Sequence, residues 1–194
     1  MSIKERVELY KLYSSMTDLV PIARRYFIIG YFDGALTILG LIMGAYLSNK
    51  VSAEVIISAG VATAIALGIS SGWGAYEAER VEQVAKKIEK NRAMLRDVGG
   101  IVERAHRFAI LVSSIVHAIS PVIASLIPLS FYIFLPLNDA FPVSISVGLI
   151  QLFVIGAFMG RISKTNIVIS GLRLVLAGLV TLIIVLLLSP SHIM

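Results

Sequence analysis

Long apolar runs separated by short polar segments form the main pattern of this chain. Five runs are long enough for a membrane-spanning helix, which needs about 20 mostly apolar residues. These runs cover residues 26–47, 55–76, 108–135, 143–160 and 167–188. They lack the strict polar–apolar alternation of transmembrane β-strands. The pattern therefore predicts an all-α fold with five transmembrane helices.

The polar segments between the runs predict the rest of the organisation. Residues 1–20 carry apolar positions at helical spacing between charges, which predicts an amphipathic helix on the membrane surface, ended by Pro21. The run 55–76 continues without a breaker into the charged residues 77–96, and Gly99 and Gly100 then interrupt it. The predicted parts are an interfacial helix (1–25), transmembrane helices (26–76), a cytoplasmic helical hairpin (77–107), further transmembrane helices (108–188) and a tail (189–194).

Composition and charge fix the class of protein and its orientation. Of the 194 residues, 57% are hydrophobic, so a soluble domain is excluded. Of the 17 Lys and Arg residues, 16 lie in 1–25, 77–107 and 161–173. Because cytoplasmic loops are enriched in basic residues, the N-terminus is predicted inside and the C-terminus outside.

The net charge of +5 is explained by this topology and by contact with anionic lipid. The basic residues flank the apolar runs and alternate with acids, so a nucleic-acid partner is not predicted. With no cysteine, the chain has neither a disulfide framework nor a thiolate metal site.

Asp33 is the only acidic residue inside any of the five apolar runs. A charge near the middle of a bilayer costs about 2.5–3.5 kcal/mol, so such a residue usually serves an ion, a proton path or a partner charge. Thr37 lies one turn further along the same helix face. The alternative is a helix–helix contact in which Asp33 bonds a hydroxyl or pairs with Arg. Small residues that permit close helix packing surround it, namely Gly30, Gly34, Gly40 and Gly44.

A second small and polar face lies near the end of the run 55–76. Gly68 and Gly72 form another close-packing pair, while Ser71 and Tyr76 offer oxygen atoms at the cytoplasmic mouth. The alternative is packing combined with an interfacial aromatic belt of Trp73 and Tyr76.

The predicted cytoplasmic hairpin carries a set of candidate metal ligands. Glu103 and His106 have the i, i+3 spacing that places both side chains on one helix face. Two such helices packed antiparallel would collect a divalent ion. The alternative is a solvated charged face, in which Glu82 and Lys86 form an ordinary i, i+4 pair. The candidate ligands of the hairpin are Glu79, Glu82, Glu89, Glu103 and His106.

His117 and Gln151 are polar residues inside apolar runs whose role the sequence leaves open. The lone histidine, His117, fits either a proton relay or an interhelical hydrogen bond. The chain has no phosphate-binding Gly-Lys-Ser/Thr loop, no evident nucleophile–base pair and no cluster of intramembrane carboxylates. We therefore predict that it is not an enzyme.

Several short motifs, taken in order and spacing, resemble the vacuolar iron transporter family over residues 22–188. The motif residues are Arg24, Gly30, Asp33, Gly34, Thr37, Gly72, Gly74, Tyr76, Ile127, Pro128, Gly160, Arg161, Ser170, Gly171, Leu172 and Arg173. The resemblance implies a homodimer that exports Fe²⁺ or Mn²⁺ from the cytosol in exchange for protons, with no permanently bound cofactor. It also implies that the two copies of Asp33 face each other on the path and that a glutamate-rich cytoplasmic segment captures metal.

Two departures from the family pattern concern the metal. The family often has Met and Glu where this chain has Ser71 and Ala75, which shifts the expected ligands toward hard oxygen. The hairpin is also short, and so compact a chain fits a prokaryotic plasma membrane. The alternative function is a non-transporting metal sensor or scaffold that dimerises through the glycine face of the run 26–47.

Overall fold

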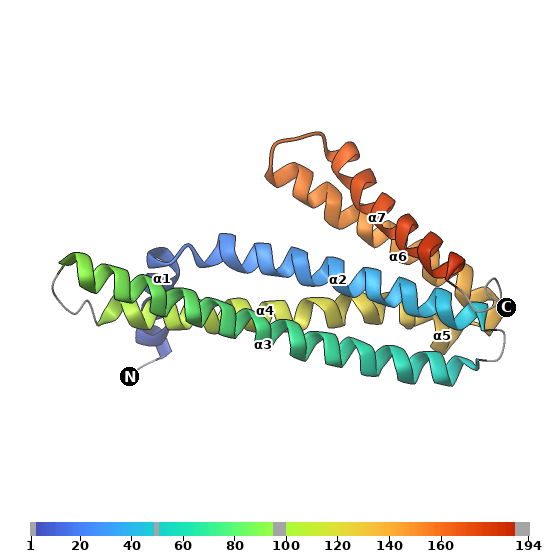
Figure 1. Cartoon of the computed structure of the whole chain (residues 1–194), viewed down its shortest axis with the longest axis horizontal. Helices are drawn as coiled ribbons and strands as arrows, with labels where there is room; N and C mark the ends of the chain where they lie inside the picture. The colour runs from blue at the N-terminus through green and yellow to red at the C-terminus, as the bar shows by residue number, and fades with distance from the viewer. Residues whose placement is uncertain (1–2, 49–50, 95–99, 189–194) are drawn as a thin grey trace. The chain divides into compact units, whose positions relative to one another are not determined.

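The computed structural model describes residues 3–48, 51–94 and 100–188, and these residues are almost entirely helical (Figure 1). In the described ranges there is no strand, so the all-α prediction is confirmed. The helices are α1 (Ile3–Met16), α2 (Leu19–Leu47), α3 (Ala53–Met94), α4 (Ile101–Leu129), α5 (Phe131–Phe134), α6 (Leu137–Ile162) and α7 (Ile167–Leu187). The predicted tail, 189–194, lies outside the described residues.

Within the described residues, five helical segments are long and apolar enough to cross a membrane, as the hydrophobic pattern predicts. They are Leu19–Leu47, Ala53–Lys86, Ile101–Phe134, Leu137–Ile162 and Ile167–Leu187. The second segment belongs to α3, which runs without interruption from Ala53 to Met94 and so continues well beyond its apolar part. Gly100, with a φ of +108°, directly precedes α4. A left-handed φ of this kind favours glycine, and it separates α4 from the preceding chain.

Two helix boundaries differ from the sequence prediction. The first helix ends at Met16 rather than at Pro21, and Asp18 follows with a left-handed φ of 49°. Pro21 lies in the first turn of α2, where its missing N–H is no loss. The helix expected from the run 143–160 also begins earlier, because α6 starts at Leu137. Pro136 caps it, and the Pro136 carbonyl accepts hydrogen bonds from the backbone N–H groups of Asp139 and Ala140.

The chain divides into two compact units, which we describe separately. The first comprises Met1–Phe27 and Ile69–Ile119, and the second comprises Ile28–Gly68 and Ser120–Met194. In the first unit, α1 packs against α4, because the rings of Tyr10 and Phe108 stack with centroids 4.9 Å apart. Helices α3 and α4 also approach closely there. A Cβ on Gly72 would lie only 2.6 Å from the Cβ of Ala118.

The second unit has its core between α2 and the helices around it. The buried core residues are Ala35, Ile38, Leu39, Ile42, Ile56, Ala124, Leu129, Tyr132, Ala140 and Leu152. Leu39 inserts against Gly148 of α6, where a Cβ would lie 2.5 Å from the Leu39 side chain. Helices α6 and α7 run side by side (Figure 1), with Gly156 close to the backbone at Ser170.

Candidate functional site

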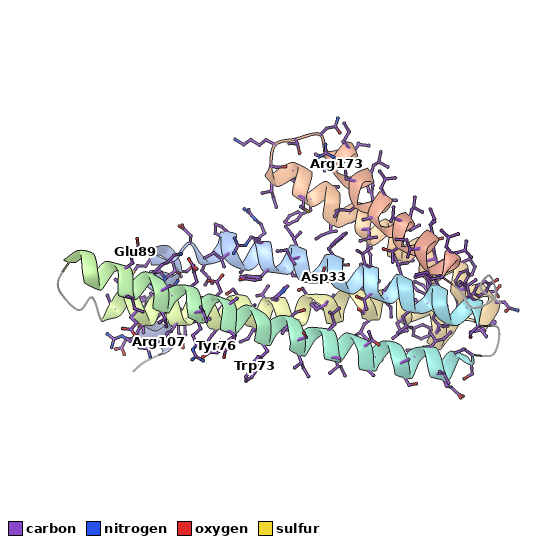
Figure 2. All side chains as sticks on the ribbon, viewed as in Figure 1. Asp33, Trp73, Tyr76, Glu89, Arg107 and Arg173 are labelled. Carbon is purple, nitrogen blue, oxygen red and sulfur yellow. The ribbon has the colours of Figure 1, made fainter. Side chains whose placement is uncertain are left out.

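Asp33 lies near the middle of α2 (Figure 2), on the side of the helix opposite the buried core residues of its own unit. Ala35, Ile38 and Leu39, at 0–1% exposure, mark the opposite, buried side of the helix. Successive residues turn by about 100°, which places Asp33 and Thr37 about 150–170° from the centre of that buried side. Both side chains are half-buried. Asp33 and Thr37 therefore form one polar stripe on the less covered side of a membrane-crossing helix.

The glycines of α2 contact other helices of the same chain. A side chain on Gly34 would overlap the backbone of Pro121 in α4, so α2 and α4 touch closely at this point. The Ser125 hydroxyl donates a hydrogen bond to the Gly34 carbonyl at 3.1 Å. A Cβ on Gly40 or Gly44 would meet side chains of α7 at ordinary van der Waals distances, 3.7 and 3.9 Å. A second copy of the chain is thus not needed to explain the small residue at position 34.

Gln151, whose role the sequence left open, makes an interhelical hydrogen bond. Its Nε2 donates to the Ala124 carbonyl of α4 at 3.0 Å. Its Oε1 accepts from the Tyr31 hydroxyl of α2 at 3.3 Å. Gln151 itself is buried. It therefore links three helices of the second unit.

His117 also takes part in an interhelical contact, here within the first unit. Its Nδ1 lies 2.9 Å from the backbone carbonyl of Tyr26. A carbonyl only accepts hydrogen bonds, so Nδ1 carries a proton in this arrangement. The rings of His117 and Tyr26 lie 5.1 Å apart.

Glu79 is held by two residues of α2 that the sequence analysis did not single out for this role. The Tyr26 hydroxyl donates to Glu79 Oε1 at 2.7 Å, and Arg25 Nη2 lies 3.7 Å from the same oxygen. The Arg25 guanidinium also sits 5.3 Å from the centre of the Tyr26 ring. The Glu79 side chain is 19% exposed, whereas that of Glu82 is 58% exposed. Glu79 is thus a sheltered carboxylate whose position is set by its neighbours.

The other glutamates among the candidate ligands of the hairpin form local ion pairs or face solvent. Glu82 pairs with Lys86 at 3.2 Å, and Glu103 pairs with Arg107 at 3.9 Å. Glu89 is exposed, and His106 is half-buried. In residues 3–48, 51–94 and 100–188, no three His, Asp or Glu side chains come together in a way that could hold a metal ion. These contacts fit the solvated charged face, and metal capture by the whole set stays a prediction.

The remaining candidates of the transport path belong to the first unit. Ser71 and Tyr76 are half-buried, while Trp73 is 69% exposed and projects away from α3 (Figure 2). The rings of Trp73 and Tyr76 lie 6.5 Å apart. This arrangement suits an interfacial aromatic belt. Asp33 and Thr37 lie in the second unit, so the structure describes the two halves of the predicted path separately.

Comparison with known proteins covers nearly the whole chain. The model of the VIT family matches residues 24–92 and 77–189. The first match contains Asp33, and the second contains His117 and Gln151. The chain is also similar to Uncharacterized protein MJ0645 of Methanocaldococcus jannaschii. The two are 32% identical over 164 residues, which is 82% of this chain and 85% of the relative.

Proposed function

The chain belongs to the VIT family of membrane metal-ion transporters, and we propose that it exports divalent transition metal from the cytosol in exchange for protons. Its membership of a transporter family also argues against an enzyme. Fe²⁺ is the first candidate for the transported ion and Mn²⁺ the second. The membrane is a prokaryotic plasma membrane in this proposal.

The position of Asp33 is the observation that supports this proposal most strongly. A carboxylate on a membrane-crossing helix is expensive unless an ion, a proton or a partner charge compensates it. Asp33 lies opposite the buried side of α2, where it can meet a transported ion without disturbing the core. Thr37 adds a hydroxyl oxygen one turn away. Oxygen ligands such as these suit hard divalent cations, and Asp33 would take a proton on the return step.

A two-fold homodimer would double this site. In a C₂ interface the same residue contributes from both copies, so two Asp33 side chains would face a single ion. The less covered side of α2 supports this arrangement, because Asp33 and Thr37 both lie on it and are only half-buried. Two carboxylates that share a site repel each other when both are ionised, and bound metal or a proton relieves that repulsion.

Among the candidate ligands of the hairpin, Glu79 is the best positioned to bind metal at the cytosolic end of the path. Its carboxylate is already oriented by the Tyr26 hydroxyl, which reduces the ordering cost of binding an ion. Incoming metal would displace Arg25, whose contact at 3.7 Å is the looser of the two. In this proposal Glu82, Glu89, Glu103 and His106 raise the local metal concentration, while Ser71 and Tyr76 serve as weaker ligands further along.

Metal uptake into proteoliposomes tests the proposal. We expect Asp33→Asn to reduce Fe²⁺ and Mn²⁺ flux at least about a hundredfold, because the amide cannot supply the negative charge that dehydrated metal requires. Asp139→Asn is the matched control, because it removes the same charge from an exposed position at the start of α6. Its flux should stay close to that of wild type.

Two other outcomes would contradict the proposal. Equal flux in Asp33→Asn and Asp139→Asn would remove Asp33 from the path. Metal binding by the wild type without any flux into sealed vesicles would favour the sensor or scaffold. A pH-sensitive dye inside the vesicles checks the coupling, since metal uptake should be matched by proton movement in the opposite direction.

A further inference from the structure

Helix α4 lacks one of its own backbone hydrogen bonds at Pro128. Pro128 lies inside the helix and has no N–H group, so it cannot donate to the carbonyl four residues earlier. That carbonyl belongs to Ala124, which is fully buried. A buried carbonyl without a donor costs about 1–3 kcal/mol, so the chain requires another donor at this point.

Gln151 of α6 supplies the donor that Pro128 cannot. Its Nε2 lies 3.0 Å from the Ala124 carbonyl, and the bond is buried. The Tyr31 hydroxyl donates to Oε1 of the same amide at 3.3 Å, so both ends of the side chain are engaged. The amide can therefore present its NH₂ group to α4 and its oxygen to α2 at the same time.

One face of α6 is built to contact this segment of α4. Ser144, Gly148 and Gln151 follow at steps of four and three, so they share a face. The Ser144 hydroxyl donates to the Pro128 carbonyl at 2.7 Å. Gly148 between them leaves room for Leu39 of α2. Two side chains of α6 thus hold the backbone of α4 on either side of this contact.

The same segment of α4 also holds the backbone of α2 next to Asp33. Ser125, which follows Ala124 directly, donates to the Gly34 carbonyl at 3.1 Å. Gly34 in turn lies directly against Pro121. A shift of residues 121–128 of α4 would therefore act on the backbone of α2 at the residue after Asp33.

We propose that Gln151 is a positioning residue that couples α6 to residues 121–128 of α4 during transport, an inference that rests on the proposed function. In an uninterrupted helix the bond to the Ala124 carbonyl would be internal and would survive any movement of α6. Here the bond joins two helices, so it must break when α4 and α6 separate. Gln151 thereby sets how readily α4 moves beside Asp33, without contacting the ion itself.

A double-mutant cycle on thermal stability tests the structural part of this inference independently of transport. Gln151→Met keeps the side-chain length but removes donor and acceptor, and it should lower the melting midpoint in detergent by about 3–6 °C. Pro128→Ala restores an N–H that can bond the Ala124 carbonyl. In that background the loss caused by Gln151→Met should fall to half or less.

Ser144→Ala is the matched control for the cycle. It removes another buried hydrogen bond between the same two helices, the bond from the Ser144 hydroxyl to the Pro128 carbonyl. The missing N–H of Pro128 leaves the Ala124 carbonyl without a donor, but it does not affect the Pro128 carbonyl. The cost of Ser144→Ala should therefore be the same in the wild type and in the Pro128→Ala background. If Gln151→Met costs as much in the Pro128→Ala background as in the wild type, Gln151 does not replace the missing donor and the inference fails.

Transport kinetics test the functional part. Gln151→Met should change the maximal flux at least about threefold and leave the metal KM within about twofold, because the side chain acts on movement and not on the ion. Tyr31→Phe, which removes only the longer bond, should change the maximal flux in the same direction but less. A changed KM with unchanged maximal flux in Gln151→Met would overturn the coupling role. Absence of flux in the wild type would instead overturn the proposed function. The stability cycle would still decide whether Gln151 supplies the hydrogen-bond donor that Pro128 lacks.

Discussion

At the residue scale, the two most informative carboxylates of this chain differ in their surroundings. Glu79 is oriented by a hydroxyl at 2.7 Å and approached by a guanidinium at 3.7 Å. Asp33 lies half-buried on the less covered side of a membrane-crossing helix. A carboxylate that is already oriented by a neighbour is suited to capture metal. A carboxylate on a membrane-spanning helix is suited to a role in the passage of an ion or a proton. The same chemical group therefore serves two steps of the proposed transport.

Replacing Tyr26 with Phe should weaken capture without stopping transport. The change removes the hydrogen bond that orients Glu79 and keeps the ring. We expect the metal KM for uptake to rise about three- to tenfold, with the maximal flux nearly unchanged, because a hydrogen bond to a charged group contributes about 1.5–3 kcal/mol and part of that orients Glu79.

Tyr10→Phe is the matched control for this prediction. It makes the same chemical change in a residue whose ring stacks on Phe108, a contact that the phenylalanine can keep. If both variants shift the KM equally, the Tyr26 hydroxyl has no special role in metal capture.

The sequence could predict Asp33 but not the partners of Glu79. An acid inside an apolar run is rare and expensive, so Asp33 is visible without a structure. Tyr26 and Glu79 are 53 residues apart, and no local spacing rule connects them. For the same reason the sequence left the role of Gln151 open, although Pro128 already indicated that the Ala124 carbonyl would need a new donor.

At the scale of helices, the lengths of the apolar runs predicted the membrane-spanning helices well. Proline was a poorer guide to where a helix ends. The five apolar segments and the long continuation of α3 follow directly from the pattern. The pattern does not predict the break between α1 and α2. The two helices share a continuous apolar periodicity, and they are separated at Asp18, which has a left-handed φ. Pro21 was an unreliable stop signal, since proline is well tolerated in the first turn of a helix.

The contact of α2 with α4 gives a prediction at this scale. Gly34→Ala places a methyl group on the backbone of Pro121, which cannot move as easily as the end of a flexible side chain. We expect a loss of about 1–3 kcal/mol in stability, measured as a lower melting midpoint in detergent.

Gly44→Ala is the control on the same helix. Its added methyl would meet Val185 at 3.9 Å, an ordinary contact, and alanine favours the helix by about 1 kcal/mol. Its melting midpoint should be unchanged or higher. Equal effects of the two substitutions would mean that the α2–α4 contact is not close at Gly34.

At the scale of the whole molecule, three independent features support a metal transporter of the membrane. The described part of the chain has five helical segments long and apolar enough to cross a membrane, and the family match extends over residues 24–189. The basic residues are concentrated in three segments between or beside these spans. The first two establish a membrane protein of a metal-transporting family, and the third predicts which side its hairpin faces. The proposed dimer adds the symmetry that would let one Asp33 per chain become a pair at the ion path.

Anomalous X-ray scattering from crystals soaked in Mn²⁺ is the sharpest test of the proposed ion path at Asp33. Manganese scatters anomalously, so its position can be located without relying on ligand geometry. If the path is correct, a manganese peak lies between two Asp33 carboxylates related by a two-fold axis. That peak is absent from Asp33→Asn crystals. Peaks confined to residues 77–107 in wild-type crystals, with none near Asp33, would contradict this path.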